Sequence, residues 1–364
     1  MSEFSSIGVE SAAAHRFEAM REKLADFLRE RRNLTFMEVC GTHTVAIFRS
    51  GLRSLLPEGL RLLSGPGCPV CVTDQGEIDI ALNLAKKDYV ILTYGDMLRV
   101  PGSSGSLLEL KGQGARVEVV VSAIQSIEIA LAHPESEVVF LGVGFETTAP
   151  ATAVTLNQAR QVGLTNLSVL CLHKTVPSAL RVLASNPALK IDGFILPGNV
   201  TVVAGMDDYA FLTEALGKAA AAAGFEPEEI LAALVDLARQ VTTGHFRLNA
   251  YRKQETPRGG NPVARKLLSE VFDPCDSRWR GMGVIPGSGY RVRKEYARFD
   301  ATEKFGLSPV SVPNNGCRCG EVLSGVLTPP ECELYGTACT PLTPVGPCMV
   351  SSEGTCGAWH RFNR

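Results

Sequence analysis

Six short apolar runs within the first 200 residues each end in glycine or polar residues. The runs lie at residues 34–44, 88–96, 115–122, 136–150, 166–177 and 191–199. Helical stretches are predicted at 123–132, 150–161, 177–185 and 206–240, the last of which includes an alanine-rich segment. Apolar runs of this length are typical of strands that are buried on both faces of a parallel sheet. Their alternation with helices predicts an α/β fold with parallel sheets.

The chain of 364 residues is too long for one ordinary core, so two or three domains are expected. Similar strand and loop endings recur in residues 33–120 and 121–245. These blocks are predicted to form two small Rossmann-like domains that face one another across a cleft. Residues 246–364 are rich in turn residues and cysteine, and we expect them to form a helical and irregular iron-sulfur module packed with the N-terminal helix at 1–32.

Composition restricts the partners and the compartment. The formal net charge of −2 and the pI near 6.3 show no basic excess, so neither nucleic acid nor an anionic membrane surface is an expected partner. The N-terminus lacks the pattern of a secretory signal, and no apolar run approaches about 18 residues. A cytoplasmic location is therefore expected, where thiols stay reduced. The eleven cysteines then indicate metal binding or redox chemistry.

Six of the eleven cysteines gather near the C-terminus, at Cys317, Cys319, Cys332, Cys339, Cys348 and Cys356. A zinc ribbon would show two close pairs with balanced spacing, whereas this array is irregular. Six thiolates among glycine and proline turns, with almost no histidine nearby, favour an iron-sulfur cluster held by four of them, with zinc as the alternative. The two remaining thiols could exchange electrons with the cluster as a dithiol/disulfide pair.

A Cys-x-x-Cys pair, Cys68 and Cys71, lies in a glycine- and proline-rich turn before an acidic, helix-like stretch. Such a pair at a helix N-terminus readily forms a disulfide. The spacing is equally compatible with a redox pair and with part of a metal site, and a purely structural role is a third possibility.

Further candidate residues lie where predicted strands end. Cys40 and His43 share one loop, and ligands of open parallel sheets bind beyond the carboxyl ends of the strands. A glycine between them permits close backbone approach, which favours a metal or partner contact over inert packing. Glu146, Thr147 and Thr148 follow another run and could supply a carboxylate and two hydroxyls. Capping of the next helix explains the threonines equally well.

Together these segments resemble the HypD family, which matures [NiFe] hydrogenases. The resemblance rests on MEVCGTHT, SGPGCPVCVT, GDMLRVPGS, GFETTAP, WRGMGVIPGSG and the cysteine-rich segment 317–356, in collinear order over residues 36–356. It implies a redox-active assembly scaffold with no classical turnover reaction. With the small chaperone HypC, such proteins hold an iron ion on which cyanide and carbon monoxide ligands are assembled to give an Fe(CN)2CO unit. HypE supplies the cyanide.

The resemblance also implies roles for individual residues. Cys40 would be an iron ligand, with His43 lining the same site. Cys68 and Cys71 would ligate this iron or act as a redox-active pair beside it. The cleft would be completed from the facing domain by Glu146, Thr147 and Thr148.

The family also binds one [4Fe-4S] cluster, in surroundings that resemble ferredoxin:thioredoxin reductase. The preferred ligands are Cys317, Cys332, Cys339 and Cys356. Cys319 and Cys348 would then form the extra dithiol, which could pass electrons to the Cys-x-x-Cys pair. Exchanging the roles of Cys317 and Cys319, or those of Cys348 and Cys356, would satisfy the spacing nearly as well. Asn199 stands where the family pattern has histidine, and residues 246–260 match only loosely.

Two functions of other classes compete with the scaffold. An iron-sulfur-dependent protein disulfide reductase of the ferredoxin:thioredoxin reductase type would use both dithiols, but it gives no role to Cys40 and His43. A zinc-stabilised binding protein is the third interpretation.

Overall fold

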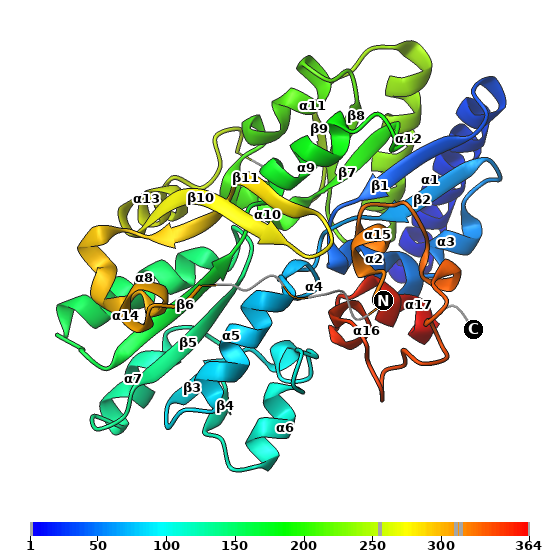
Figure 1. Cartoon of the computed structure of the whole chain (residues 1–364). Helices are drawn as coiled ribbons and strands as arrows, with labels where there is room; N and C mark the ends of the chain where they lie inside the picture. The colour runs from blue at the N-terminus through cyan, green and yellow to red at the C-terminus, as the bar shows by residue number, and fades with distance from the viewer. Residues whose placement is uncertain (1–2, 254–256, 309–311, 313–315, 363–364) are drawn as a thin grey trace.

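The computed structural model describes residues 3–253, 257–308, 312 and 316–362, and Figure 1 shows how its elements are arranged. Two parallel sheets and one antiparallel hairpin organise the chain, which confirms the predicted α/β class. The strands are β1 Leu34–Glu38, β2 Leu60–Ser64, β3 Val90–Thr93, β4 Val117–Val119, β5 Val138–Gly144, β6 Leu167–His173, β7 Gly193–Pro197, β8 Ala219–Ala223, β9 Asn249–Tyr251, β10 Phe272–Trp279 and β11 Gly283–Val292.

Helices connect and cover these strands (Figure 1). The α-helices are α1 Glu3–Glu30, α2 Gly41–Arg49, α3 Leu52–Leu55, α4 Pro69–Val72, α5 Gln75–Ala85, α6 Leu107–Gly112, α7 Gln125–Ala132, α8 Ala149–Gln161, α9 Val176–Ser185, α10 Gly198–Ala204, α11 Ala210–Glu214, α12 Pro227–Thr243, α13 Pro262–Val271, α14 Ala301–Phe305, α15 Cys319–Leu323, α16 Pro347–Val350 and α17 Thr355–Phe362. The 3-10 helices of the described residues are η1 Gly95–Met97, η2 Asp207–Tyr209, η3 Lys294–Phe299 and η4 Pro329–Glu331. Within the described ranges, no helix is long and apolar enough to cross a membrane.

The first sheet has the order β2-β1-β7-β8-β9 and the second has the order β4-β3-β5-β6. All neighbouring strands in both sheets are parallel. Strands β5, β7 and β8 are buried along their whole length, because helices cover both faces. In such sheets the loops that follow neighbouring strands begin at one edge, and these loops carry most of the candidate residues.

The strand pairing does not follow the expected division at residue 120. Strands β1 and β2 from the first expected block pair with β7, β8 and β9, whereas β3 and β4 pair with β5 and β6. The chain therefore leaves the first sheet after β2, builds the whole second sheet, and returns at β7. Alternation of strands and helices along a sequence reports crossover units but not which strands become neighbours, so it could not reveal this exchange.

The alanine-rich segment forms strand β8 and not the expected helix. It lies fully buried between β7 and β9, where α12 packs on it. The Gln240 side chain of α12 bonds to the N–H and C=O of Ala220, at 3.4 and 3.2 Å. Alanine prefers helix by only tenths of a kcal/mol over most residues, so burial of a whole central strand overrides this preference. The small side chains allow the helix to approach the sheet closely.

The N-terminal helix α1 packs on α12. Leu24 and Leu28 of α1 share a buried cluster with Leu231 and other apolar residues of α12. The C-terminal segment packs on α2, where Trp359 meets Phe48 edge-on at 5.3 Å between ring centroids. The expected packing of the N-terminal helix with the C-terminal module stays a prediction. The apolar stripe of α1 matches the leucine-rich face of α12, and this match decides its position.

The hairpin β10–β11 was not anticipated from the sequence. Its strands pair antiparallel, with a register shift between Cys275 and Ser277. The hairpin reaches the Cys-x-x-Cys segment through a bridge between Trp279 and Thr73, and it reaches β6 through a bridge between Gly289 and Lys174. It therefore links the Cys-x-x-Cys segment to the end of β6 in the second sheet.

Candidate functional site

Cys40 lies between the end of β1 and the start of α2, in extended backbone geometry. Its N–H donates to Glu38 Oε2 at 3.0 Å, and the Thr44 hydroxyl donates to the other carboxylate oxygen. Burial raises the pKa of the Cys40 thiol to about 12, and the charges of Glu353 and Glu38 act in the same direction. At neutral pH the group is therefore a neutral thiol, unless a cation replaces its proton.

The Cys-x-x-Cys loop lies directly against the Cys40 loop. Strands β1 and β2 are neighbours, so the loops that follow them begin side by side. The Gly41 N–H donates to Gly67 O at 3.1 Å. A Cβ on Gly67 would overlap the backbone of Cys40, so only glycine fits there. The fold thus joins two motifs that the sequence separates by about 28 residues.

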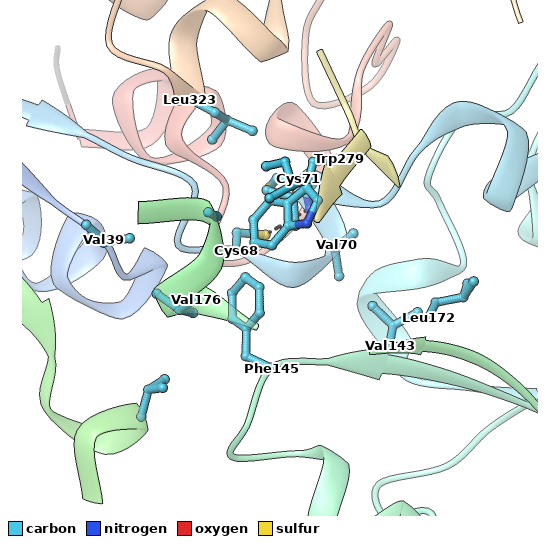
Figure 2. Close-up of a cluster of buried hydrophobic side chains, with 14 of the residues drawn as sticks. Val39, Cys68, Val70, Cys71, Val143, Phe145, Leu172, Val176, Trp279 and Leu323 are labelled. Atoms are coloured by element: carbon cyan, nitrogen blue, oxygen red, sulfur yellow. Dashed lines mark hydrogen bonds between the residues drawn. The ribbon is translucent and has the colours of Figure 1, made fainter. Parts of the chain in front are cut away.

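Cys68 caps the short helix α4, and the Cys71 N–H donates to its sulfur at 3.2 Å. Both side chains are buried, with exposed fractions of 3% and 0%. Burial is the main reason that the pKa of Cys71 lies well above its usual value. Figure 2 shows the pair within a cluster that also contains Phe145 and Trp279, whose rings stack at 6.0 Å. The pair is therefore shielded from solvent by apolar side chains.

A series of hydrogen bonds joins the pair to the C-terminal segment. The Cys68 thiol donates to Ser351 Oγ at 3.2 Å, and the Ser351 hydroxyl donates to Asp96 Oδ2 at 3.0 Å. Ser352 adds its N–H and hydroxyl to the same oxygen, at 3.0 and 2.8 Å. Sequence reasoning assigned no role to these polar residues, although Asp96 and both serines lie within the quoted motifs.

His43 lies on α2 and turns toward the end of β8. Its Nε2 is 2.8 Å from Gly224 O and 3.3 Å from Ala223 O, and its ring packs against Phe225. Burial lowers the pKa of His43 to about 4, so the ring is neutral at pH 7. Nε2 then carries the hydrogen, since a carbonyl only accepts, and the buried Nδ1 has no partner in the described structure.

All six C-terminal cysteines line one cavity. The sulfur atoms of Cys319 and Cys348 lie 2.7 Å apart within it. The Cys348 thiol also interacts with the thiols of Cys71 and Cys356, and the Cys319 thiol interacts with that of Cys317. A series of interacting thiols therefore leads from Cys71 to Cys348 and Cys319 in the C-terminal cavity.

The donor set of this cavity fits an iron-sulfur cluster by its chemistry, because six thiols and mainly apolar neighbours surround it. The open space is about 20 Å³, room for roughly one water molecule, because the thiols lie against one another. Among the described residues, no group of three or more His, Cys, Asp or Glu side chains is already arranged around a metal position. A cluster would therefore require the thiols to lose protons and move apart.

The three residues expected from the facing domain occupy different environments. Glu146 is buried, with Oε1 accepting from the Val176 N–H at 2.9 Å and Oε2 lacking a partner among the described residues. Thr147 is exposed, and Thr148 precedes α8 without a capping bond from its side chain. Glu146 lines a cavity of about 760 Å³, and Cys40 is not among the described residues that line it.

Tyr209 was missed in the sequence, and the charges of both Glu146 and Cys40 act on its side chain. The buried Tyr209 hydroxyl has no partner in the described structure. Burial, followed by the charges of Glu146, Asp208 and Cys40, raises its pKa well above the usual value. Tyr209 is therefore within electrostatic range of both Glu146 and Cys40. Its position depends on a 3-10 turn after α10, for which no sequence motif was available.

Glu146→Gln is expected to reduce the loss of stability as pH rises. Burial raises the pKa of Glu146 to about 8, so the folded protein holds a proton that the unfolded chain releases above its ordinary pKa. Stability from this group is therefore highest at low pH and falls as pH rises to about 8. Urea unfolding at pH 5.5 and 7.5 should show a slope shallower by up to about 1.4 kcal/mol per pH unit in the variant. Equal slopes would show that Glu146 ionises normally.

Comparison with known proteins gives consistent results. Residues 15–363 match the model of the HypD family, described as the hydrogenase formation hypA family. A Cupriavidus necator protein named hydrogenase maturation factor HypD is 44% identical over 339 residues, covering 90% of this chain and 89% of the relative. The Escherichia coli (strain K12) protein of the same name is 42% identical over 356 residues, covering 94% and 95%. An Azotobacter vinelandii protein of that name is 43% identical over 343 residues, covering 92% and 90%.

Proposed function

The chain belongs to the HypD family and is a hydrogenase maturation factor, and from this premise we propose that it is the scaffold on which the iron unit of a [NiFe] hydrogenase is assembled. Its cargo is an iron ion that receives cyanide and carbon monoxide to become Fe(CN)2CO. A HypC-like small chaperone shares the cargo, and a HypE-like protein donates the cyanide.

The observation that carries this proposal is the contact between the Cys40 loop and the Cys-x-x-Cys loop, together with the sulfur series behind them. Thiolate is a soft ligand that suits iron carrying cyanide and carbon monoxide. Cys40 is our candidate for the ligand, because an iron ion would displace the proton that burial otherwise retains. The Ser351–Glu353 turn covers Gly41, so entry of the cargo requires this turn to move.

The buried thiols support two consecutive exchange steps. When Cys68 and Cys71 form a disulfide, the Cys348 thiolate can attack the Cys71 sulfur and release the Cys68 thiolate. The Cys319 thiolate then attacks the Cys348 sulfur, which forms a Cys319–Cys348 disulfide and releases the Cys71 thiolate. Two electrons thereby move from one pair to the other. The contacts of Cys348 with Cys71 and Cys319 support this order.

The same contacts favour one ligand set for the [4Fe-4S] cluster. Cys319 and Cys348 are buried and engage one another and Cys71, which suits a dithiol. The remaining four cysteines would hold the cluster, namely Cys317, Cys332, Cys339 and Cys356. When bound, the cluster would supply single electrons to the neighbouring dithiol.

The burial of Cys68 and Cys71 argues against a function as a reductase of disulfides in other proteins. Cys68 and Cys71 have exposed fractions of 3% and 0%, so a disulfide on another protein could not reach either sulfur in this structure. A reductase also leaves Cys40 and its bonded carboxylate Glu38 without a role. The pair is better placed to react with cargo or thiols inside the molecule.

Cys348→Ser is expected to slow reduction of a Cys68–Cys71 disulfide by about 100-fold or more, because an intramolecular exchange step is lost. The measurement is anaerobic reduction with dithionite, followed by rapid alkylation and mass spectrometry of the peptides. Cys171→Ser is the matched control, since Cys171 lies on β6 and its thiol bonds to Tyr290 O outside the series. Reduction of the Cys348→Ser protein at the wild-type rate would contradict the exchange order. The scaffold function itself is tested by the infrared bands of iron-bound cyanide and carbon monoxide in the assembled complex.

A further inference from the structure

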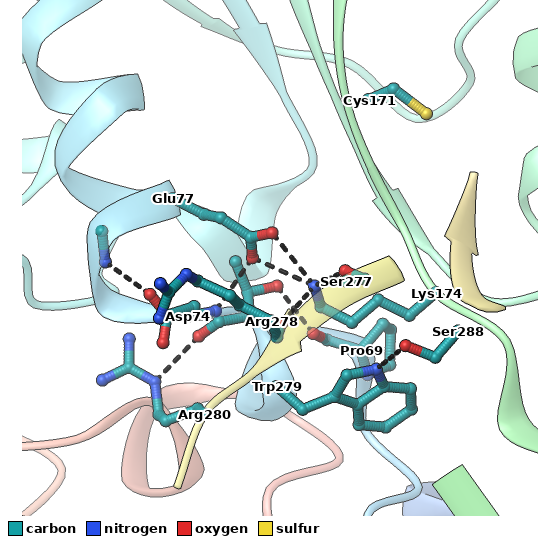
Figure 3. A network of polar contacts seen from close by, with 12 residues as sticks. Pro69, Asp74, Glu77, Cys171, Lys174, Ser277, Arg278, Trp279, Arg280 and Ser288 are labelled. Atoms are coloured by element: carbon teal, nitrogen blue, oxygen red, sulfur yellow. Dashed lines mark hydrogen bonds and ion pairs between the residues drawn. The ribbon is translucent and has the colours of Figure 1, made fainter. Parts of the chain in front are cut away.

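Arg280, at the tip of the β10–β11 hairpin, is a buried cation whose role the proposed function does not explain. Its N–H donates to Val72 O at 2.9 Å, directly after Cys71. Its guanidinium donates from Nε to Thr73 O and from Nη1 to Gln75 Oε1, each at 2.8 Å. Figure 3 shows Arg280 beside the polar network that surrounds the start of α5. These bonds fix the side chain against the Cys-x-x-Cys segment.

Among the described residues, no carboxylate forms an ion pair with Arg280. The side chain is 9% exposed, and no ion pair with a described Asp or Glu includes it. Nη2 is buried and has no hydrogen-bond partner in the described structure. A guanidinium stays charged at any pH relevant to proteins, so it cannot avoid this cost by losing a proton. An unpaired buried charge indicates an anion that the protein chain itself does not supply.

The nearest candidate for that anion lies in the C-terminal cavity. Gly281 packs against Gly320 so closely that a Cβ on either glycine would overlap the other, and Gly320 follows Cys319. This backbone approach places the hairpin tip that carries Arg280 against the start of α15, where Cys319 lines the cysteine cavity.

We propose that Arg280 is the buried cation that compensates the negative charge of the iron-sulfur cluster in this cavity, and that it raises the reduction potential of the cluster. The inference rests on the cluster in the proposed function. Reduction adds an electron, and so one negative charge, to a group already made anionic by thiolates. A fixed positive charge in a dry environment favours the reduced form more strongly than the oxidised form. Arg280 therefore acts as a positioning and tuning residue and not as a ligand.

The test is the midpoint potential of the cluster, measured by electron paramagnetic resonance during an anaerobic redox titration of the full chain. Arg280→Gln is expected to lower the potential, shifting the one-electron equilibrium by about tenfold, which corresponds to about 59 mV. Arg280→Lys keeps the charge and should remain closer to wild type. Iron and sulfide content and thermal unfolding are measured for every variant.

Arg318→Gln is the matched control. Arg318 also borders the cavity and separates Cys317 from Cys319, but its side chain is 39% exposed and paired with Glu321. Solvent screens its charge, so its removal should shift the potential much less.

The outcomes separate this inference from the proposed function. A wild-type protein without a [4Fe-4S] signal would overturn the cluster assignment, and this inference with it. A wild-type cluster whose potential is unchanged in Arg280→Gln, or changes as much in Arg318→Gln, would overturn this inference alone. Loss of the cluster from Arg280→Gln but not from Arg280→Lys would support charge compensation, whereas loss from both variants would overturn it.

Discussion

In Cys40→Ala, the infrared bands of iron-bound cyanide and carbon monoxide should disappear from the protein co-purified with its small chaperone. The bands should be present in the wild-type complex. Cys40 is the thiol at the carboxyl end of β1, and its loop contacts the loop that carries Cys68 and Cys71. Alanine removes the proposed sulfur ligand but keeps the backbone bonds that begin α2, so the loss should be complete while the fold remains.

Two further measurements make this result interpretable. Cys171→Ala is the control, because this half-buried cysteine lies on β6 and contacts Tyr290 O. Its complex should retain the bands, and thermal unfolding should show that the Cys40→Ala protein is folded. Bands that persist in Cys40→Ala would remove Cys40 as a ligand. Absence of these infrared bands from a fully assembled wild-type complex would contradict the scaffold function.

Lys174→Ala is expected to lower the free energy of unfolding by about 3–5 kcal/mol, because it leaves a buried carboxylate without its partner. The Lys174 side chain is 1% exposed, and its Nζ lies 3.1 Å from Glu77 Oε2. It also donates to Ser277 Oγ at 2.9 Å and to Arg278 O at 2.7 Å (Figure 3). Burial raises the pKa of Glu77, and the charge of Lys174 opposes that rise. Urea unfolding at pH 7 measures the effect.

A double variant separates the lost charge from the lost volume. Lys174→Met with Glu77→Gln removes both charges and fills the space, so it should recover part of the stability that Lys174→Ala loses. Lys266→Ala is the surface control, since its pair with Glu270 is long, at 3.8 Å, and exposed. Its effect should stay within about 0.5 kcal/mol. Equal effects of Lys174→Ala and Lys266→Ala would contradict a structural role for the buried pair.

Several elements of the fold were predictable from local pattern. The apolar runs that contain β1, β3, β4, β5, β6 and β7 all form strands, and the expected helices α7, α8 and α9 are present. These elements are predictable because the spacing of apolar residues along consecutive positions indicates which segments are buried strands and which are helices. The prediction of a helix at the all-alanine strand β8 was wrong, because the conformation of this segment depends on its two neighbouring strands and on α12. The hairpin β10–β11 was missed because its strands contain proline, glycine and charged residues.

By itself, the sequence determined the α/β class, the candidate thiols and, through its collinear motifs, the family. These properties depend on which residue types occur and in what order. Only the tertiary structure decided that β1 pairs with β7, that α1 packs on α12, and that Cys348 meets Cys71. It also decided that Arg280 is buried with no carboxylate partner among the described residues. Such contacts join residues tens to hundreds of positions apart, and they depend on packing and burial that no local pattern encodes.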